Sequence, residues 1–175
     1  MIKPVQDFVQ KFVEEHGSPN EVLEIGSRNI NGGVRHLFHS NYTGVDLQAG
    51  ADVEVVMDAM DLRSQFKEES VDCVICLETL EHVKNPLAIV DNMRWVLKYG
   101  GWMIITTPGI GHPRHDWPAD YYRFFEDTYR DVFFKGFENC RFETKYWDYK
   151  DIIKSPNDVY PMAVMGWGQK AKSHD

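Results

Sequence analysis

The sequence is poor in cysteine and lacks a long apolar run. Its three cysteines are an odd number, which argues against a disulfide-stabilised secreted scaffold. No stretch approaches the length of a membrane span, and the opening residues MIKPVQDFVQ do not have the charged-then-apolar order of a signal peptide. We therefore expect a cytoplasmic protein with no membrane partner.

Basic residues are also scarce, because 19 Lys and Arg stand against 27 Asp and Glu, for a formal net charge of -8. Such a chain has no general attraction for polyphosphate, so nucleic acid is a disfavoured partner. What the chain does have is a hydrophobic content of 43% over 175 residues. This is enough for one domain, spanning residues 1–175, whose core needs neither disulfides nor a structural metal.

The most informative segment runs from residue 22 to residue 46. A short apolar strand is followed by Gly26, which lets the backbone turn sharply and approach a ligand with no Cβ in the way. Asp46 ends the next strand, twenty positions after Gly26, about the distance at which an acidic side chain reaches a ribose diol in doubly wound folds. The segment predicts a pocket for an adenosine-containing cofactor.

The apolar pattern predicts alternating strands and helices along most of the chain. We expect strands at 21–25, 43–46, 53–57, 71–77 and 102–107, and helices at 4–16, about 32–39, 86–97 and 126–135. Two further strands are expected at 141–150 and 159–169. This order predicts an α/β fold, a doubly wound, mostly parallel sheet with a C-terminal antiparallel strand pair, in which ligands bind beyond the carboxyl ends of the strands.

Cys73 and Cys76 have the spacing of a CxxC motif, but they lie within the apolar run VDCVICL. That run reads as a buried strand, so a reduced, buried pair is expected rather than a redox or zinc site.

Five motifs in order carry a family resemblance. They are LEIGS (23–27), GVDL (44–47), MDAMDL (57–62), VDCVICLETLEHVKNP (71–86) and LKYGGWMIITTPG (97–109). Together they resemble the class I S-adenosylmethionine-dependent methyltransferases, in particular the small, single-domain type 11-like members. The resemblance implies a Rossmann-like methyltransferase fold, S-adenosyl-L-methionine as cofactor, and methyl transfer to an oxygen or nitrogen of a small or medium-sized acceptor.

The resemblance also assigns cofactor contacts. Glu24, Gly26 and Ser27 would hold the methionine end, and the segment at Asp46 and Leu47 would hold the ribose. Asp58 and the backbone N–H of Ala59 would read the adenine, while the backbone around Leu77 would add a further contact. One departure is Arg28, which stands where the common pattern has its second glycine.

Methyl transfer from a sulfonium asks mainly for alignment and removal of a proton from the acceptor. The candidate proton acceptors are His82 and, from a long loop after residue 107, His112, His115, Asp116 and Tyr121. A metal site formed by His112, His115 and Asp116 lacks a fourth ligand, so no metal is expected.

Two other functions remain open. A nicotinamide-dependent reductase would use the same turn and acidic residue, and Tyr146 and Lys150 have the spacing of a YxxxK pair, although in a segment that reads as strand. A catalytically inactive nucleotide-binding module of the same fold is the second alternative, favoured by Arg28. A small-molecule substrate is expected, and its site would come from the N-terminal helix, the 108–125 loop or the second subunit of a homodimer.

Overall fold

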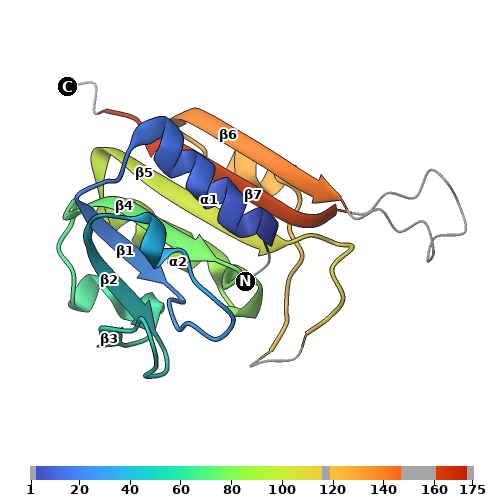
Figure 1. The fold of residues 1–175 in the computed structure, drawn as a ribbon, viewed down its shortest axis with the longest axis horizontal. Helices are drawn as coiled ribbons and strands as arrows, with labels where there is room; N and C mark the ends of the chain where they lie inside the picture. The colour runs from blue at the N-terminus through green and yellow to red at the C-terminus, as the bar shows by residue number, and fades with distance from the viewer. Residues whose placement is uncertain (1–2, 116–118, 147–160, 173–175) are drawn as a thin grey trace, which may run out of the picture.

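The fold is a seven-stranded mixed sheet with helices on both faces (Figure 1). The computed structural model describes residues 3–115, 119–146 and 161–172. The strand order is β3-β2-β1-β4-β5-β7-β6. The strands are β1 (Glu21–Ile25), β2 (Asn41–Asp46), β3 (Val55–Val56), β4 (Val71–Leu77), β5 (Leu97–Pro108), β6 (Phe137–Tyr146) and β7 (Pro161–Lys170).

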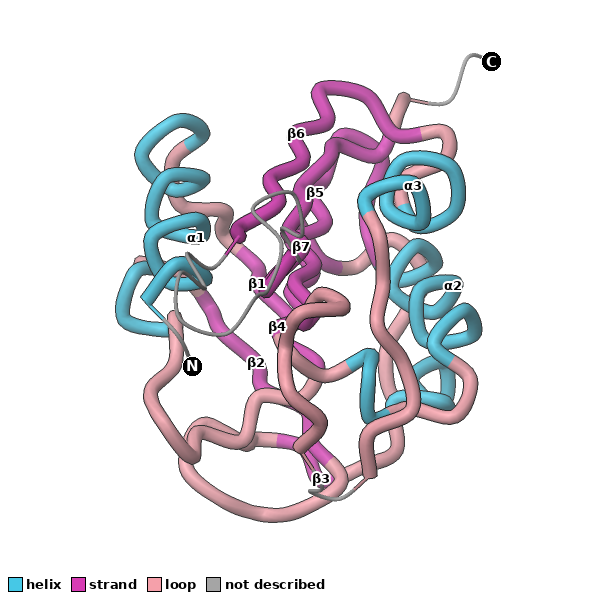
Figure 2. The backbone as a smooth tube through the Cα atoms, turned by 90° about the vertical axis from the view of Figure 1, so that its right-hand side faces the viewer, coloured by secondary structure: helices cyan, strands magenta, loops and turns pink. Residues whose placement is uncertain are grey.

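The first five strands run parallel, and β7 then pairs antiparallel with both β5 and β6. Because β1, β2 and β4 share one direction, Ile25, Asp46 and Leu77 all end at the same edge of the sheet. Figure 2 shows the connecting loops gathered at this end, next to β3. The predicted α/β fold with its antiparallel C-terminal pair is confirmed.

One face of the sheet is covered by α1 (Lys3–His16), and the other by α2 (Pro86–Val96) and the helical segment formed by α3 (Glu126–Thr128) and η4 (Tyr129–Phe133) (Figure 2). Helix α1 buries Phe8 and Phe12 against Trp167 of β7, with ring centroids 4.4 and 5.7 Å apart. Helix α2 begins with Asn85 as N-cap, whose side chain accepts a hydrogen bond from the Ala88 N–H. Both helices place one apolar stripe on the core.

The two cysteines of β4 point to opposite faces, because residues three apart in a strand alternate sides. Cys73 belongs to the apolar cluster under α1, and Cys76 to the cluster under α2. Both are fully buried and free, and burial raises the pKa of each thiol. The expectation of a buried, reduced pair is confirmed.

Three predicted elements differ from the structure. The helix expected at about 32–39 is only the 3-10 turn η1 (Arg35–Leu37), because Gly32 has φ +93° and extended backbone at Phe38 ends the turn. The strand expected at 53–57 shortens to β3. Leu97, expected in a helix, is instead the first residue of β5.

Two further 3-10 segments, η2 (Ala59–Ser64) and η3 (Leu80–His82), follow β3 and β4 at the loop-rich end of the sheet. Strands β6 and β7 confirm the two late strands; β6 begins earlier than expected, at Phe137, and the expected residues 147–150 and 159–160 lie outside the described ones. Among the described residues, no helix is both long and apolar enough to cross a membrane.

Candidate functional site

A cavity of about 250 Å³ lies at the carboxyl ends of β1, β2 and β4, where the sequence predicts the cofactor pocket. Its walls come from the loops that follow these strands and from the start of η2. The predicted site residues that line it are Gly26, Asp46, Leu47, Asp58, Ala59 and His82. Chain segments more than fifty residues apart thus meet around one opening.

Gly26 allows the turn after β1 to come close to the loop after β4 at the floor of the cavity. Its φ of +76° is a left-handed conformation that glycine adopts without steric cost. Its N–H donates to the Val45 carbonyl at 2.8 Å, which ties the turn to β2. A Cβ added to Gly26 would lie 2.1 Å from Oγ1 of Thr79, so only glycine fits between the two loops.

Asp46 is already held in place by backbone donors. Its Oδ2 accepts from the Arg28 N–H at 3.3 Å, and its Oδ1 accepts from the Gln48 N–H at 2.9 Å. Each carboxylate oxygen has two lone pairs, so both keep capacity for a ribose hydroxyl. Asp46 does not cap a helix, because β2 leads into bends and a turn.

Asp58 does act as a cap. Its Oδ1 accepts from the Met60 N–H at 2.9 Å at the start of η2, while its side chain still lines the cavity beside Ala59. The cap and a cofactor contact are compatible, since the second carboxylate oxygen stays available.

Glu24, Ser27 and Leu77 do not line the cavity. Glu24 is 5% exposed, and it accepts a hydrogen bond from the Tyr42 hydroxyl at 2.8 Å. Burial raises the pKa of Glu24 to about 7. Ser27 is also buried, and Leu77 accepts from the Thr79 hydroxyl through its carbonyl. These residues shape the turn behind the cavity wall.

Arg28 lies along the rim of the cavity. Its guanidinium donates to the Gln48 side chain at 2.6 Å, and its aliphatic stem packs on Gly50, where an added Cβ would come 2.9 Å from Cγ. The side chain is partly exposed, and the departure from the family's glycine pattern is accommodated by Gly50 on the facing loop.

A cluster of titratable side chains adjoins the cavity beyond β4. His82, which lines the cavity, has its Nε2 3.1 Å from Nε2 of His115. Glu81 is fully buried next to them, and its Oε1 lies 3.5 Å from His82 Nε2 and 3.7 Å from His115 Nε2. Burial raises the pKa of Glu81 and lowers that of His115.

An ion pair holds the loop that carries His115. The Asp120 carboxylate pairs with the Arg123 guanidinium and accepts the His115 backbone N–H at 2.9 Å. Arg123 also donates to the carbonyls of His112 and Pro113. Arg123 holds the pKa of Asp120 well below its usual range.

The other predicted proton acceptors lie farther from the cluster of Glu81, His82 and His115 or outside the described residues. The ring of His112 lies 5.2 Å from that of His115, and its Nδ1 contacts the Pro113 carbonyl. The Tyr121 side chain is 47% exposed, while its backbone N–H donates to the Glu81 carbonyl. Asp116 and Lys150 lie outside the described residues. The sequence places Glu81 just past β4, directly before His82, but it did not indicate a role for this residue.

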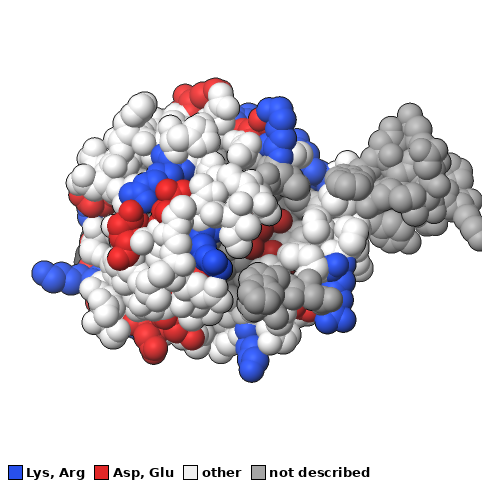
Figure 3. Space-filling model, turned by 60° about the horizontal axis from the view of Figure 1, so that its bottom comes forward, with Lys and Arg blue, Asp and Glu red and all other residues white. Residues whose placement is uncertain are grey.

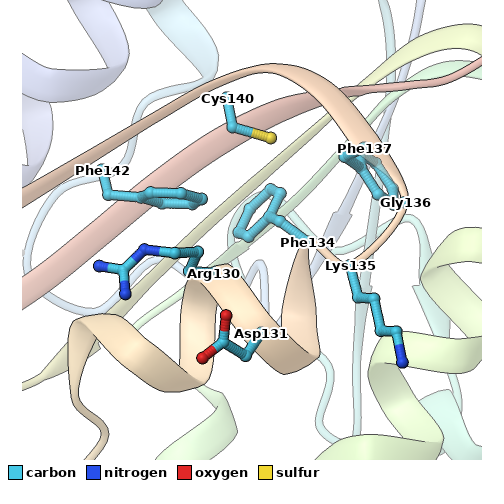
Figure 4. A pocket seen from close by; sticks show the side chains of 8 residues that line it. All are labelled: Arg130, Asp131, Phe134, Lys135, Gly136, Phe137, Cys140 and Phe142. Carbon is cyan, nitrogen blue, oxygen red and sulfur yellow. The ribbon is translucent and has the colours of Figure 1, made fainter.

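A second hollow, of about 530 Å³, lies between η4 and the start of β6 (Figure 4). Phe134, Phe142 and Cys140 form much of its lining. The first residues of β6 pair with the last residues of β7, so this hollow is at the end of the sheet opposite to the cofactor cavity. It contains none of the predicted site residues.

The surface in Figure 3 carries acidic and basic side chains interspersed, with no continuous basic patch on that face. This distribution agrees with the net charge of -8.

Comparison with known proteins agrees with this geometry. The family model described as methyltransferase domain matches residues 1–135. Ubiquinone biosynthesis O-methyltransferase of Paraburkholderia xenovorans is 36% identical over 61 residues, covering 35% of this chain and 26% of that protein. The Hydrogenovibrio crunogenus protein of the same name is 26% identical over 119 residues, covering 61% and 46%. The chain thus spans less than half the length of these curated relatives.

A solved structure shows the same fold over almost the whole chain. Phosphoethanolamine N-methyltransferase 2 of Haemonchus contortus, in complex with phosphomonomethylethanolamine and S-adenosylhomocysteine, superposes with a TM-score of 0.70 at 18% identity. The match covers 97% of this chain and 53% of that one. The Rossmann-like fold of S-adenosylmethionine-dependent methyltransferases expected from the motifs is confirmed, and no comparison supports a reductase. With its family model matched over residues 1–135, the chain belongs to the methyltransferase domain family.

Proposed function

We propose that the chain transfers a methyl group from S-adenosyl-L-methionine to an oxygen of a small hydroxyl-bearing molecule. The observation that carries this proposal is the cavity that brings Gly26, Asp46 and Asp58 together, with His82 on its wall. The two relatives named as O-methyltransferases support an oxygen acceptor over a nitrogen one.

The residues fit the cofactor in three places. Gly26 lets the turn after β1 pack directly against Thr79, which a Cβ would prevent, and so closes this side of the cavity. Asp46 offers free lone pairs to a ribose diol, and Asp58 with the Ala59 N–H offers an acceptor and a donor to an adenine edge. Glu24 and Ser27 stand behind the turn and fix the backbone that faces the methionine end. When bound, the cofactor supplies an activated methyl group on a sulfonium.

The chain's own contribution to the chemistry is to orient the acceptor and to manage its proton. A hydroxyl placed in line with the methyl group must lose its proton as it reacts. The imidazoles of His82 and His115 lie beside the cavity and can receive that proton, and the ring of His112 lies next to that of His115. Loop residues 108–115 and 119–125 would then form the acceptor side.

Calorimetric titration with S-adenosylhomocysteine tests the cofactor site. Asp46→Ala should abolish measurable binding without changing the fold, while Asp61→Ala, an exposed aspartate of η2 that does not line the cavity, should bind like the wild type. Equal affinity of Asp46→Ala and wild type, or binding of NADH in place of S-adenosylhomocysteine, would overturn the assignment.

Turnover would separate an active enzyme from an inactive module of the same fold. A product methylated on oxygen, detected by mass spectrometry with a panel of small phenols and alcohols, is the expected result. A homodimer, a cytoplasmic location and the exclusion of nucleic acid stay predictions, which size-exclusion chromatography with light scattering, localisation in cells and filter binding would test.

A further inference from the structure

Three side chains beside the cofactor cavity direct ligand atoms at one point. Glu81 Oε1, His82 Nε2 and His115 Nε2 form a triangle with sides of 3.5, 3.7 and 3.1 Å. Two of the three residues are adjacent in η3, and the third comes from the loop after β5. The convergence therefore depends on the fold.

The buried carboxylate of Glu81 has no hydrogen-bond donor. Within the described part of the chain, neither of its oxygens has a hydrogen-bond partner, and its side chain is 0% exposed. An ionised carboxylate without a partner is costly to bury, so such groups are paired with a cation or with a metal. The Arg123 guanidinium lies close enough to act on this carboxylate, but it is paired with Asp120.

In both histidines, the second ring nitrogen, Nδ1, faces an oxygen atom. Nδ1 of His82 contacts the Ala119 carbonyl, and Nδ1 of His115 is 3.4 Å from Oδ2 of Asp120. A nitrogen that faces an oxygen acceptor is the one that carries the hydrogen. In the tautomer with the hydrogen on Nδ1, each imidazole presents the lone pair of its Nε2 to the other and to Glu81. The two Nε2 atoms and Oε1 of Glu81 are then three possible ligand atoms that face one another.

We propose that Glu81, His82 and His115 bind a divalent transition-metal ion, such as Zn²⁺. A triangle with the observed sides has a circumscribed radius of about 2.0 Å, which matches typical zinc–nitrogen and zinc–carboxylate distances. Two histidines and one glutamate form the three-ligand set of catalytic zinc sites, in which a fourth position stays open. The hydrogen bond between Nδ1 of His82 and the Ala119 carbonyl, and the one that the His115 backbone N–H donates to Asp120, are outer-shell contacts of the kind that orient metal-ligating histidines.

The location suggests what the open position would bind. His82 also lines the cofactor cavity, so a ligand on the ion would lie next to that cavity. A hydroxyl oxygen bound to a divalent cation loses its proton to solvent more readily than a free one. This role, which rests on the proposed function, would make the histidines ligands of the ion rather than proton acceptors. The metal site itself rests on the ligand geometry alone.

Direct metal binding tests the proposal. Purified chain stripped with a chelator should take up one equivalent of Zn²⁺ in calorimetric titration, and Co²⁺ should give the visible absorption of a low-coordinate site. Glu81→Gln and His115→Ala should each weaken Zn²⁺ binding by more than 100-fold, beyond the roughly 10–100-fold typical of an outer-shell change. Asp120→Asn, which alters an outer-shell contact, should fall within that range.

His112→Ala is the matched control, because His112 lies on the same loop, beside His115, and is not a proposed ligand. It should bind Zn²⁺ like the wild type. Zn²⁺ should also raise the melting temperature of the wild type but not that of Glu81→Gln, which circular dichroism would show to be folded. No zinc uptake, or equal uptake by wild type and both ligand variants, would overturn the proposal.

The cofactor titration keeps this result separate from the proposed function. Wild type that binds S-adenosylhomocysteine but no metal would refute the ion and leave the methyltransferase assignment standing. Wild type that binds one Zn²⁺, lost in Glu81→Gln, but no S-adenosylhomocysteine would support the metal site and refute the cofactor cavity.

Discussion

Gly26 and Thr79, which both line the cofactor cavity, lie so close together that a Cβ on Gly26 would stand 2.1 Å from the threonine Oγ1. Gly26→Ala should therefore force the two loops apart and abolish measurable S-adenosylhomocysteine binding. The positive φ alone costs about 1–2 kcal/mol for a residue with a Cβ, and the clash should add to this. Calorimetric titration and chemical denaturation measure the two effects.

Gly17→Ala separates the conformational cost from the clash. Gly17 has φ +79°, almost the same as Gly26, but nothing lies within 4 Å of its added Cβ. The Gly17 variant should lose about 1–2 kcal/mol of stability and bind the cofactor normally. If both variants lose the same stability and neither loses binding, the contact with Thr79 has no functional importance.

The residues of the cofactor cavity that lie at the ends of single strands could be predicted from the sequence. Gly26 directly follows β1, Asp46 is the last residue of β2, and Asp58 comes two residues after β3; parallel strands bring such positions to one edge. The end of each strand can be recognised from the sequence alone, and the parallel arrangement of the strands then places these residues side by side. The helix expected at about 32–39 does not form, because Gly32 adopts a positive φ that apolar spacing alone does not indicate.

The cluster of Glu81, His82 and His115 could not be predicted in the same way. His82 and His115 are separated by 33 residues, and their contact depends on the path of the loop after β5. That path is fixed by the Asp120–Arg123 pair and by the carbonyls that Arg123 contacts. Such contacts leave no periodic pattern in a sequence, so the sequence offered His112 as an equal candidate.

Glu24 should make the free energy of unfolding depend on pH in the range between the ordinary pKa of glutamate and the raised pKa of Glu24 in the folded protein. The fold raises the pKa of Glu24 from 4.5 to about 7, so the folded state binds the proton more tightly than the unfolded state. The free energy of unfolding should therefore fall as pH rises from about 4.5 to about 7 and stay lower above that range. Glu24→Gln should remove this decline and exceed the wild type by about 3 kcal/mol at pH 8.

Urea unfolding at pH 5 and pH 8 measures this difference. Tyr42→Phe is the complementary variant, because loss of the hydroxyl that donates to Glu24 should push the pKa higher and deepen the decline. A Glu24→Gln variant with the same pH dependence as the wild type would mean that the carboxylate is not the responsible group.

Asp120→Asn should loosen the loop that carries His115 without affecting the cofactor cavity. The substitution weakens the pair with Arg123, and neither residue lines the cavity. Turnover should fall at least tenfold, while S-adenosylhomocysteine affinity stays within about twofold, a difference of roughly 0.4 kcal/mol. Limited proteolysis should cut this loop faster in the variant.

The same variant has a pH signature with a defined sign. Arg123 lowers the pKa of Asp120, so the carboxylate stabilises the fold above the pKa of the unfolded chain and loses this effect as pH falls through the folded value. Wild type should thus be more stable than Asp120→Asn at neutral pH, and the gap should close in acid. Asp127→Asn, which breaks an exposed pair with Arg130 at the same spacing, should show little change at any pH.

Arg28→Ala tests whether the residue in place of the family's second glycine obstructs the site. The Arg28 contact that matters for Asp46 is its backbone N–H, which alanine retains. The lost side-chain hydrogen bond to Gln48 is exposed, and such bonds contribute about 0.5–1.5 kcal/mol or less. We therefore expect S-adenosylhomocysteine affinity within about threefold of the wild type. A tenfold gain would show that the guanidinium blocks the rim, whereas a tenfold loss would show that it contacts the bound cofactor.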